Sequence, residues 1–222
     1  MKTSERLRSE YSYLWEKLFQ HPFVLEMGLG SLPIEKFQFY VKQDYYFLIQ
    51  YSRVLAIAAA KAPSLDFISQ FSDLLTETIN TEMDLHRSFA QKFNIPIDSL
   101  ENVEPAPITI AYTDYLLRVA YEGSLLDIIS TLLPCQWGYA ETGDYLKANS
   151  NLSSDNQYIS WIEMYTSEEF GCFVEQLKEN LDELADGGGE STYNGIAGHF
   201  LTSTRYEYLF WDMSYNLSTW PV

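Results

Sequence analysis

Residues 35–61 read EKFQFYVKQDYYFLIQYSRVLAIAAAK, and this stretch decides the fold class. Its apolar residues recur at intervals of three and four, which is the spacing of one face of an α-helix. The stripe comprises Phe37, Tyr40, Val41, Asp44, Leu48, Tyr51, Leu55, Ala58 and Ala59. Only Asp44 interrupts its apolar character. The pattern therefore predicts a long helix that turns one carboxylate toward the protein interior.

The rest of the chain repeats this periodicity. Helices are predicted over residues 4–19, 64–93, 108–122, 124–149, 156–184 and 195–216, with a break near Gly171. Proline and glycine separate these segments, as at His21-Pro22, Ala62-Pro63 and Gly187-Gly188-Gly189. No segment shows the alternation of a strand. We expect an all-α, single-domain helical bundle of about seven to eight helices over residues 1–222.

The net charge of the chain makes some classes of binding partner unfavourable. Fourteen Lys and Arg stand against 31 Asp and Glu, giving a formal net charge of −17, which repels phosphate backbones and anionic membranes. We therefore expect no nucleic-acid partner and no membrane association. The 17 tyrosines suggest either a pocket for a flat polar ring or a large subunit interface.

Segments that would direct the chain to a membrane or out of the cell are not evident. There is no apolar run of 18 residues and no secretory signal pattern, so a cytoplasmic protein is predicted. The two cysteines, Cys135 and Cys172, are expected to be reduced thiols. Without a Cys/His cluster, no metal site is predicted.

The segment Pro134-Cys135-Gln136-Trp137-Gly138-Tyr139 places a thiol just after a proline within a predicted helix. Proline should bend the helix there, and Gly138 should leave a small gap beside the thiol. Cys135 can be read as a nucleophile or as a small core residue, which is the usual role of a lone cysteine. The spacing leaves both readings open.

Two carboxylates are predicted to point inward. Asp44 has apolar and aromatic neighbours at three and four residues, and Glu207 has the same setting beside Phe210 and Trp211. A buried Glu207 would serve as a general acid. For Asp44 a structural alternative is a hydrogen bond from a tyrosine of another helix.

The histidines offer less. Glu82 and His86 lie one helical turn apart and are predicted to form a polar pair, but the Glu-x-x-His repeat of di-iron bundles is absent. His21, which precedes Pro22, is predicted to stand at the start of a helix.

Several motifs along the chain match a known family. They are His21-Pro22-Phe23, Gln43-Asp44, Ala111-Tyr112-Thr113, Pro134-Cys135-x-Trp137-x-Tyr139, Trp161-Ile162 with Tyr165, and Tyr206-Glu207-Tyr208-x-Phe210-Trp211. Through them the chain resembles, nearly end to end, the TenA or thiaminase II proteins, which are all-helical enzymes with a haem-oxygenase-like fold. Because Cys135 is present, it resembles the cysteine-bearing branch.

The resemblance implies an aminopyrimidine aminohydrolase that acts in thiamine salvage. Such an enzyme hydrolyses 4-amino-5-aminomethyl-2-methylpyrimidine to the 5-hydroxymethyl compound with release of ammonia, and cleaves thiamine as a side activity. It implies a homotetramer without cofactor or metal. In this chain Cys135 would be the nucleophile and Glu207 the acid that protonates the leaving amine. The pyrimidine would be held or polarised by Asp44, Tyr112, Tyr139 and Tyr165.

One position of the predicted substrate site departs from the family. Phe47 stands where the family commonly has a tyrosine, so a hydroxyl that would assist the cysteine is missing. Two alternative functions remain open. One is a pyrimidine-binding or regulatory protein on the same scaffold, and the other is a haem or di-iron oxygenase with His21 as a ligand.

Overall fold

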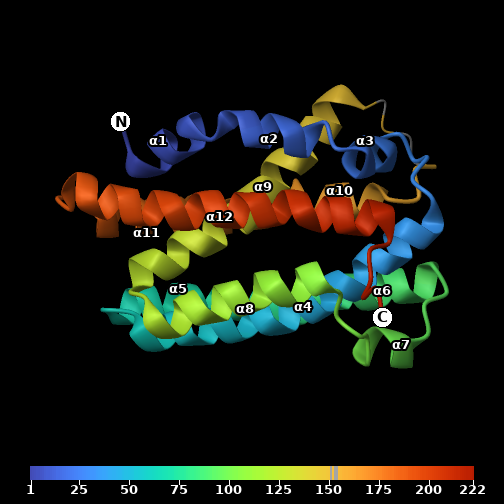
Figure 1. Ribbon diagram of the computed structural model, residues 1–222, viewed down its shortest axis with the longest axis horizontal. Helices are drawn as coiled ribbons and strands as arrows, with labels where there is room; N and C mark the ends of the chain where they lie inside the picture. The colour runs from blue at the N-terminus through green and yellow to red at the C-terminus, as the bar shows by residue number, and fades with distance from the viewer. Residues whose placement is uncertain (151, 153–154) are drawn as a thin grey trace. The chain divides into compact units, whose positions relative to one another are not determined.

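The regular structure of the protein is helical. The computed structural model describes residues 1–150, 152 and 155–222, and no β-strand occurs among them (Figure 1). The predicted all-α class is confirmed.

Twelve α-helices and one π-helical turn make up the described chain. Their bounds are Thr3–Glu10 (α1), Ser12–Phe19 (α2), Pro22–Gly28 (α3), Ile34–Lys61 (α4), Leu65–Glu77 (α5), Thr78–Glu82 (η1), Met83–Lys92 (α6), Ile97–Glu101 (α7), Pro107–Glu122 (α8), Leu125–Asn149 (α9), Ile159–Tyr165 (α10), Glu168–Ala185 (α11) and Gly189–Asn216 (α12). The elements α5, η1 and α6 follow one another without a gap.

The predicted number of helices was wrong. Counting α5, η1 and α6 as one, the described residues form 11 continuous helices instead of seven to eight. Two short helices, α3 and α7, form where proline and glycine predicted loops. Tyr11 divides the helix predicted over residues 4–19, and the helix predicted over residues 156–184 also forms as two.

The second of these breaks lies before Gly171, at Thr166 and Ser167. The side chain of Ser167 accepts a hydrogen bond of 3.2 Å from the backbone N–H of Phe170 and so caps the first turn of α11. Gly171 lies inside α11, where an added Cβ would meet no described atom within 4 Å. The cap therefore sets the boundary, and the glycine is accommodated within the helix.

The described residues group into two compact units. The first comprises Met1–Leu32 and Ile129–Asp212, and the second comprises Pro33–Ile128 and Met213–Val222. The expectation of a single domain over residues 1–222 stays a prediction.

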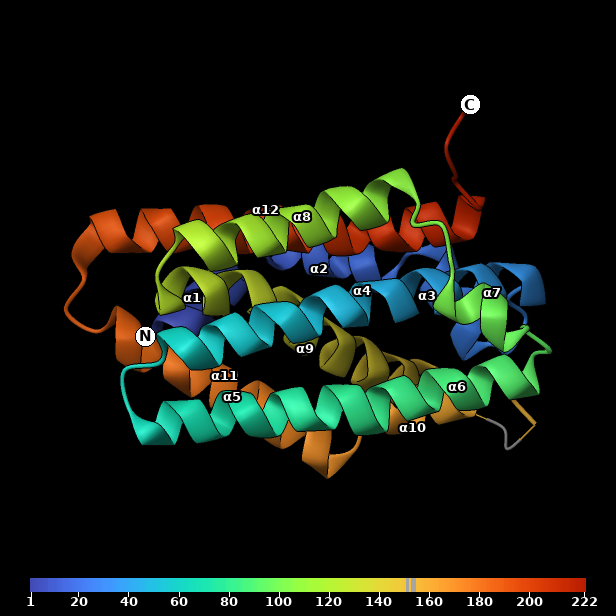
Figure 2. The same ribbon diagram turned by 90° about the horizontal axis from the view of Figure 1, so that it is seen from below.

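In the second unit α4 is the central helix. It contacts α5, η1, α6, α7 and α8, and Figures 1 and 2 show α8 running alongside it. Eight members of the predicted stripe are buried, Asp44 among them, and only Ala59 is partly exposed. Burial of this stripe supplies the apolar contact that holds these neighbouring elements to α4.

In the first unit α9 carries Pro134 in its interior and continues to Asn149. Helix α1 packs against α11, where the backbone N–H and the hydroxyl of Ser4 each donate a 2.8 Å hydrogen bond to the carboxylate of Asp182. Across the described chain, no helix is both long enough and apolar enough to cross a bilayer.

Candidate functional site

In the second unit, Asp44 lies on the inner face of α4 and is 3% exposed. Its Oδ2 atom accepts a 3.0 Å hydrogen bond from the hydroxyl of Tyr40, one turn earlier on the same helix. The same oxygen lies 2.7 Å from Nε2 of His86 on α6. The predicted inward carboxylate is confirmed, but its tyrosine partner belongs to its own helix, and its partner on another helix is a histidine.

His86 is completely buried and is anchored through both ring nitrogens. Nδ1 lies 2.9 Å from the backbone carbonyl oxygen of Glu82. The predicted polar pair of Glu82 and His86 is therefore present, but it is formed by the backbone carbonyl of Glu82. The carboxylate that pairs with His86 is that of Asp44. Burial lowers the pKa of His86, but the hydrogen bond and the charge of Asp44, with Glu82, outweigh it and leave the pKa raised.

The residues around His86 in the sequence indicate that its side chain is buried. On the helical spacing its neighbours are Met83, Phe89 and Ala90, all of them buried. A histidine on such an apolar face needs a partner for each nitrogen, as Asp44 does for its oxygens. What the spacing could not give is the pairing itself, because 42 residues separate the two side chains.

Phe47 and Tyr112, also in the second unit, are in direct contact. Both are buried, and their ring centroids lie 5.1 Å apart in a tilted arrangement. Phe47 also stacks on Tyr51, with centroids 5.9 Å apart. Three of the seven predicted site residues, Asp44, Phe47 and Tyr112, thus lie in this unit.

In the first unit, Cys135 follows Pro134 on α9 and is half-buried. It is not part of a disulfide. The predicted gap at Gly138 is present, since an added Cβ there would meet no atom of the described chain within 4 Å. The thiol therefore lies on a helix face with free space one turn away.

Aromatic rings from two helices of the first unit, α10 and α12, surround Tyr139 of α9. Its ring centroid lies 4.8 Å from that of Tyr165 in an edge-on arrangement, 5.6 Å from Trp161 and 5.2 Å from Trp211. The ring centroids of Tyr165 and Trp161 lie 4.5 Å apart. Tightly packed rings have few alternative rotamers, so the cluster holds the two predicted site tyrosines in fixed positions.

Glu207 lies on α12 and is 4% exposed, which confirms the prediction that it points inward. Ser203, one turn earlier, is fully buried, and its hydroxyl has no hydrogen-bond partner among the described residues. The seven predicted site residues thus fall into two sets. Asp44, Phe47 and Tyr112 form one, and Cys135, Tyr139, Tyr165 and Glu207 form the other.

His21 stands at the start of α3, as predicted. Its Nδ1 accepts a 3.1 Å hydrogen bond from the backbone N–H of Phe23, and its Nε2 lies 3.8 Å from a carboxylate oxygen of Asp212. Burial lowers the pKa of His21, and Asp212 opposes this only in part. His21 thus caps the start of α3 through Nδ1. Its Nδ1 lone pair is used in this hydrogen bond, so this nitrogen cannot also bind a metal.

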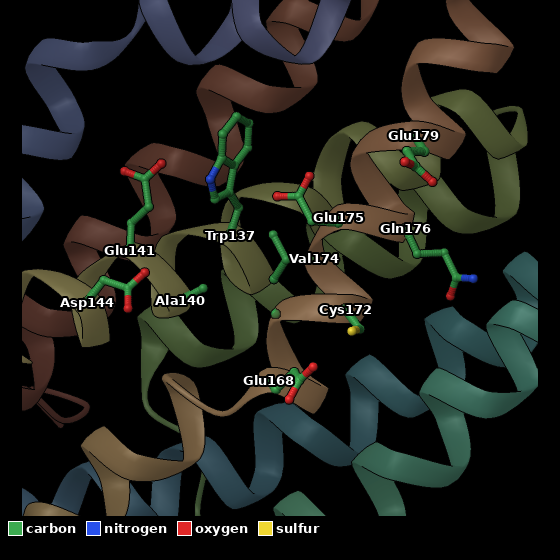
Figure 3. Close-up of a pocket in the computed structure, with 11 residues that line it drawn as sticks. Trp137, Ala140, Glu141, Asp144, Glu168, Cys172, Val174, Glu175, Gln176 and Glu179 are labelled. Atoms are coloured by element: carbon green, nitrogen blue, oxygen red, sulfur yellow. The ribbon is translucent and has the colours of Figure 1, made fainter.

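A surface cavity of about 520 Å³ lies elsewhere in the first unit (Figure 3). It lies along α9 and α11, and Figure 3 shows Glu141, Glu168 and Glu175 among the acidic side chains that line it. Cys172 is exposed in its wall. None of the seven predicted site residues lines this cavity, so we do not assign the reaction to it.

The chain is similar to known proteins in both sequence and fold. Residues 8–217 match the model of the TENA/THI-4/PQQC family. A protein of Halalkalibacterium halodurans named aminopyrimidine aminohydrolase is 45% identical over 93% of this chain and 92% of its own length. One of Bacillus subtilis with the same name is 35% identical over 99% of this chain and 92% of its own length.

Solved structures agree with this similarity. A TenA homologue from P. horikoshii superimposes with a TM-score of 0.88 at 29% identity, covering 97% of this chain and 99% of the other. A domain from Shewanella denitrificans described as having a haem-oxygenase-like fold gives a TM-score of 0.74 at 14% identity, covering 96% and 92%. The second comparison bears on the fold alone, and it confirms the predicted haem-oxygenase-like class.

Proposed function

The chain belongs to the TENA/THI-4/PQQC family, and we propose that it is an aminopyrimidine aminohydrolase, a hydrolase that acts on a C–N bond. The observation that carries the proposal is the 45% identity, over 93% of the chain, to a protein of that name. The substrate would be 4-amino-5-aminomethyl-2-methylpyrimidine, the product its 5-hydroxymethyl analogue, and thiamine would be cleaved as a side activity.

Cys135 would act as the nucleophile. Its thiolate adds to a carbon of the pyrimidine ring, which forms a C–S bond and interrupts the aromaticity. The ring electrons then expel the amine from the neighbouring methylene, and Glu207 gives its proton to that nitrogen so that neutral ammonia leaves. The half-buried position of Cys135 and the burial of Glu207 support these roles.

Water completes the reaction. Its oxygen adds to the exposed methylene, and its proton returns to the Glu207 carboxylate. The C–S bond then breaks, the thiolate leaves and the ring becomes aromatic again. The net change is the exchange of the amino group for a hydroxyl, with one water consumed and one ammonia released.

Four residues would bind the pyrimidine. Tyr139 and Tyr165 are packed edge to face and offer flat surfaces with hydroxyl groups at their rims. Asp44 offers a carboxyl oxygen for the N–H groups of the ring, and Tyr112 offers a hydroxyl. Phe47 supplies only apolar contact at this site, so we expect the thiol to be less strongly activated than in relatives with a tyrosine there.

A pyrimidine-binding or regulatory protein is the second candidate, and the absence of a hydroxyl at Phe47 is what favours it.

We also propose that the chain forms one domain, acts in the cytoplasm and assembles as a homotetramer. Light scattering of the purified protein tests the assembly: the mass of a single chain or of a dimer would exclude the tetramer.

An ammonia assay with the aminomethyl pyrimidine tests the enzyme directly. We expect ammonia and the hydroxymethyl product in equal amounts, and loss of both in Cys135→Ser and Glu207→Gln. Binding of the pyrimidine without ammonia release would instead favour the binding protein. An iron content or a haem absorption band in the purified protein would favour the oxygenase.

A further inference from the structure

The hydrogen bonds to Asp44 all end on one of its two oxygens. The hydroxyl of Tyr40 lies 3.0 Å and Nε2 of His86 lies 2.7 Å from Oδ2. No residue that the structure describes donates a hydrogen bond to Oδ1. The carboxyl group is thus fixed through one oxygen, while the other is left as an acceptor.

The partners of His86 determine where its protons lie. Nδ1 lies 2.9 Å from the carbonyl oxygen of Glu82, which can only accept, so Nδ1 carries a hydrogen. Nε2 faces a carboxyl oxygen at 2.7 Å, so a second hydrogen must lie between these two atoms. The buried pair of Asp44 and His86 therefore holds one proton more than a neutral imidazole and a separate carboxylate.

This extra proton has an electrostatic consequence. Whether it resides on the ring or on the carboxyl group, the pair of Asp44 and His86 carries no net charge. A buried carboxylate without such compensation would be strongly disfavoured. The other polar groups that face the pair are the hydroxyl of Tyr40 on α4 and Glu82 on η1, and Glu82 adds to the positive bias on His86.

We propose that His86 is a positioning residue for Asp44, which it holds by Oδ2 so that Oδ1 accepts a hydrogen bond from an N–H of the aminopyrimidine. This inference rests on the proposed function, in which Asp44 binds the substrate. His86 itself touches neither substrate nor reacting atoms. Its loss should weaken substrate binding much more than it slows the chemical step.

The test compares two substitutions of the same residue. His86→Leu removes the donor to Asp44, whereas His86→Gln retains an N–H that can reach the same oxygen. We expect His86→Leu to raise KM for the aminomethyl pyrimidine at least about tenfold, with kcat changed less than about threefold. His86→Gln should recover most of this loss. Arg87→Gln, on the exposed face of the same helix, is the matched control and should leave both constants unchanged.

A second measurement does not depend on turnover, and its deciding step uses the wild-type protein. In the proton NMR spectrum of the wild-type protein, the hydrogen between Nε2 and Oδ2 should give a strongly downfield resonance. That resonance should be lost in Asp44→Asn and should shift when the hydroxymethyl pyrimidine binds. A wild-type spectrum in which saturating product leaves the resonance unmoved would overturn the proposal.

The outcomes separate this inference from the function on which it rests. If the wild-type protein is active and a folded His86→Leu retains its KM within twofold, the positioning role is wrong and the aminohydrolase stands. The role is also wrong if Gln and Leu impair the enzyme equally. If the wild-type protein neither binds nor converts the pyrimidine, the proposed function fails, and the ligand role of Asp44 fails with it.

Discussion

The ring of Phe47 packs against the ring of Tyr112 with 5.1 Å between their centroids. Both side chains are buried, so the contact excludes water from the surface that they share. Position 47 contributes no hydroxyl there, although the family resemblance leads us to expect one. In the proposed site, adding a single oxygen atom at position 47 should therefore change the activity.

Phe47→Tyr should raise kcat/KM for ammonia release by roughly 3- to 10-fold, because the variant gains the hydroxyl that the family resemblance implies would assist the thiol. The alkylation profile of the Cys135 thiol as a function of pH should also change in the variant. Phe47→Leu, which changes the packing without adding a donor, is the control. An unchanged rate together with an unchanged alkylation profile in Phe47→Tyr would show that the hydroxyl has no role.

Glu207→Gln keeps the size of the side chain but removes the acid that we propose protonates the leaving amine. We expect ammonia release to fall by about 10²- to 10⁴-fold, since the amine must then leave without an acid. Affinity for the hydroxymethyl product should change little. Glu163→Gln, at an exposed position of α10, is the matched control and should be fully active. Equal rates in wild type and Glu207→Gln would assign the proton to another group.

His21 should make the protein less stable in mild acid. Burial lowers its pKa below 6.5, so the unfolded chain binds the proton more readily than the folded protein. The contribution of His21 to stability is therefore present above pH 6.5 and is lost as pH falls through the lowered pKa. His21→Asn retains a side chain that can cap α3 but does not titrate.

Urea unfolding of both proteins at pH 7 and at pH 5 measures this effect. The free energy of unfolding of the wild type, relative to His21→Asn, should decrease as the pH is lowered. The effect of pH on stability through His86 is opposite to that through His21. The pKa of His86 is raised, so its contribution to the free energy of unfolding is present below pH 6.5 and is lost as pH rises through the raised value. A difference between wild type and His21→Asn that is independent of pH would contradict the assignment to His21.

Gln43 anchors the segment that leads into α8. Its amide donates a 3.1 Å hydrogen bond to the carbonyl of Glu104, and its Oε1 accepts from the N–H of Ala106 at 2.8 Å and the hydroxyl of Thr109 at 2.7 Å. Gln43→Leu leaves these groups without their partner, so the free energy of unfolding should fall by about 3 kcal/mol. Gln91→Leu, at an exposed position, should change it by less than about 0.5 kcal/mol. Denaturant titration of both variants tests the difference, and equal midpoints would contradict it.

Much of the fold could be predicted because helical periodicity is a local property. The stripe on α4 and the inward positions of Asp44 and Glu207 follow from spacings of three and four residues. The helix ends were harder, since they depend on hydrogen bonds of single side chains. The predicted break occurs four residues before Gly171, because the side chain of Ser167 caps the start of α11 there.

The candidate site could be predicted only in part. Each residue was found from its own helix, and the roles came from the family resemblance. The bond between His86 and Asp44 was missed because it joins α6 to α4, and no rule of local spacing relates residues 42 positions apart. Tertiary pairing of this kind is what the structure adds to the sequence.

The central claim is that Cys135 is the nucleophile of an aminohydrolase. Ammonia release from the aminomethyl pyrimidine by Cys135→Ser tests it most directly, with Cys172→Ser, at an exposed position, as the matched control. The account predicts that Cys135→Ser loses at least about a thousandfold in kcat and still binds the hydroxymethyl product, while Cys172→Ser is fully active. Full turnover by Cys135→Ser would contradict it.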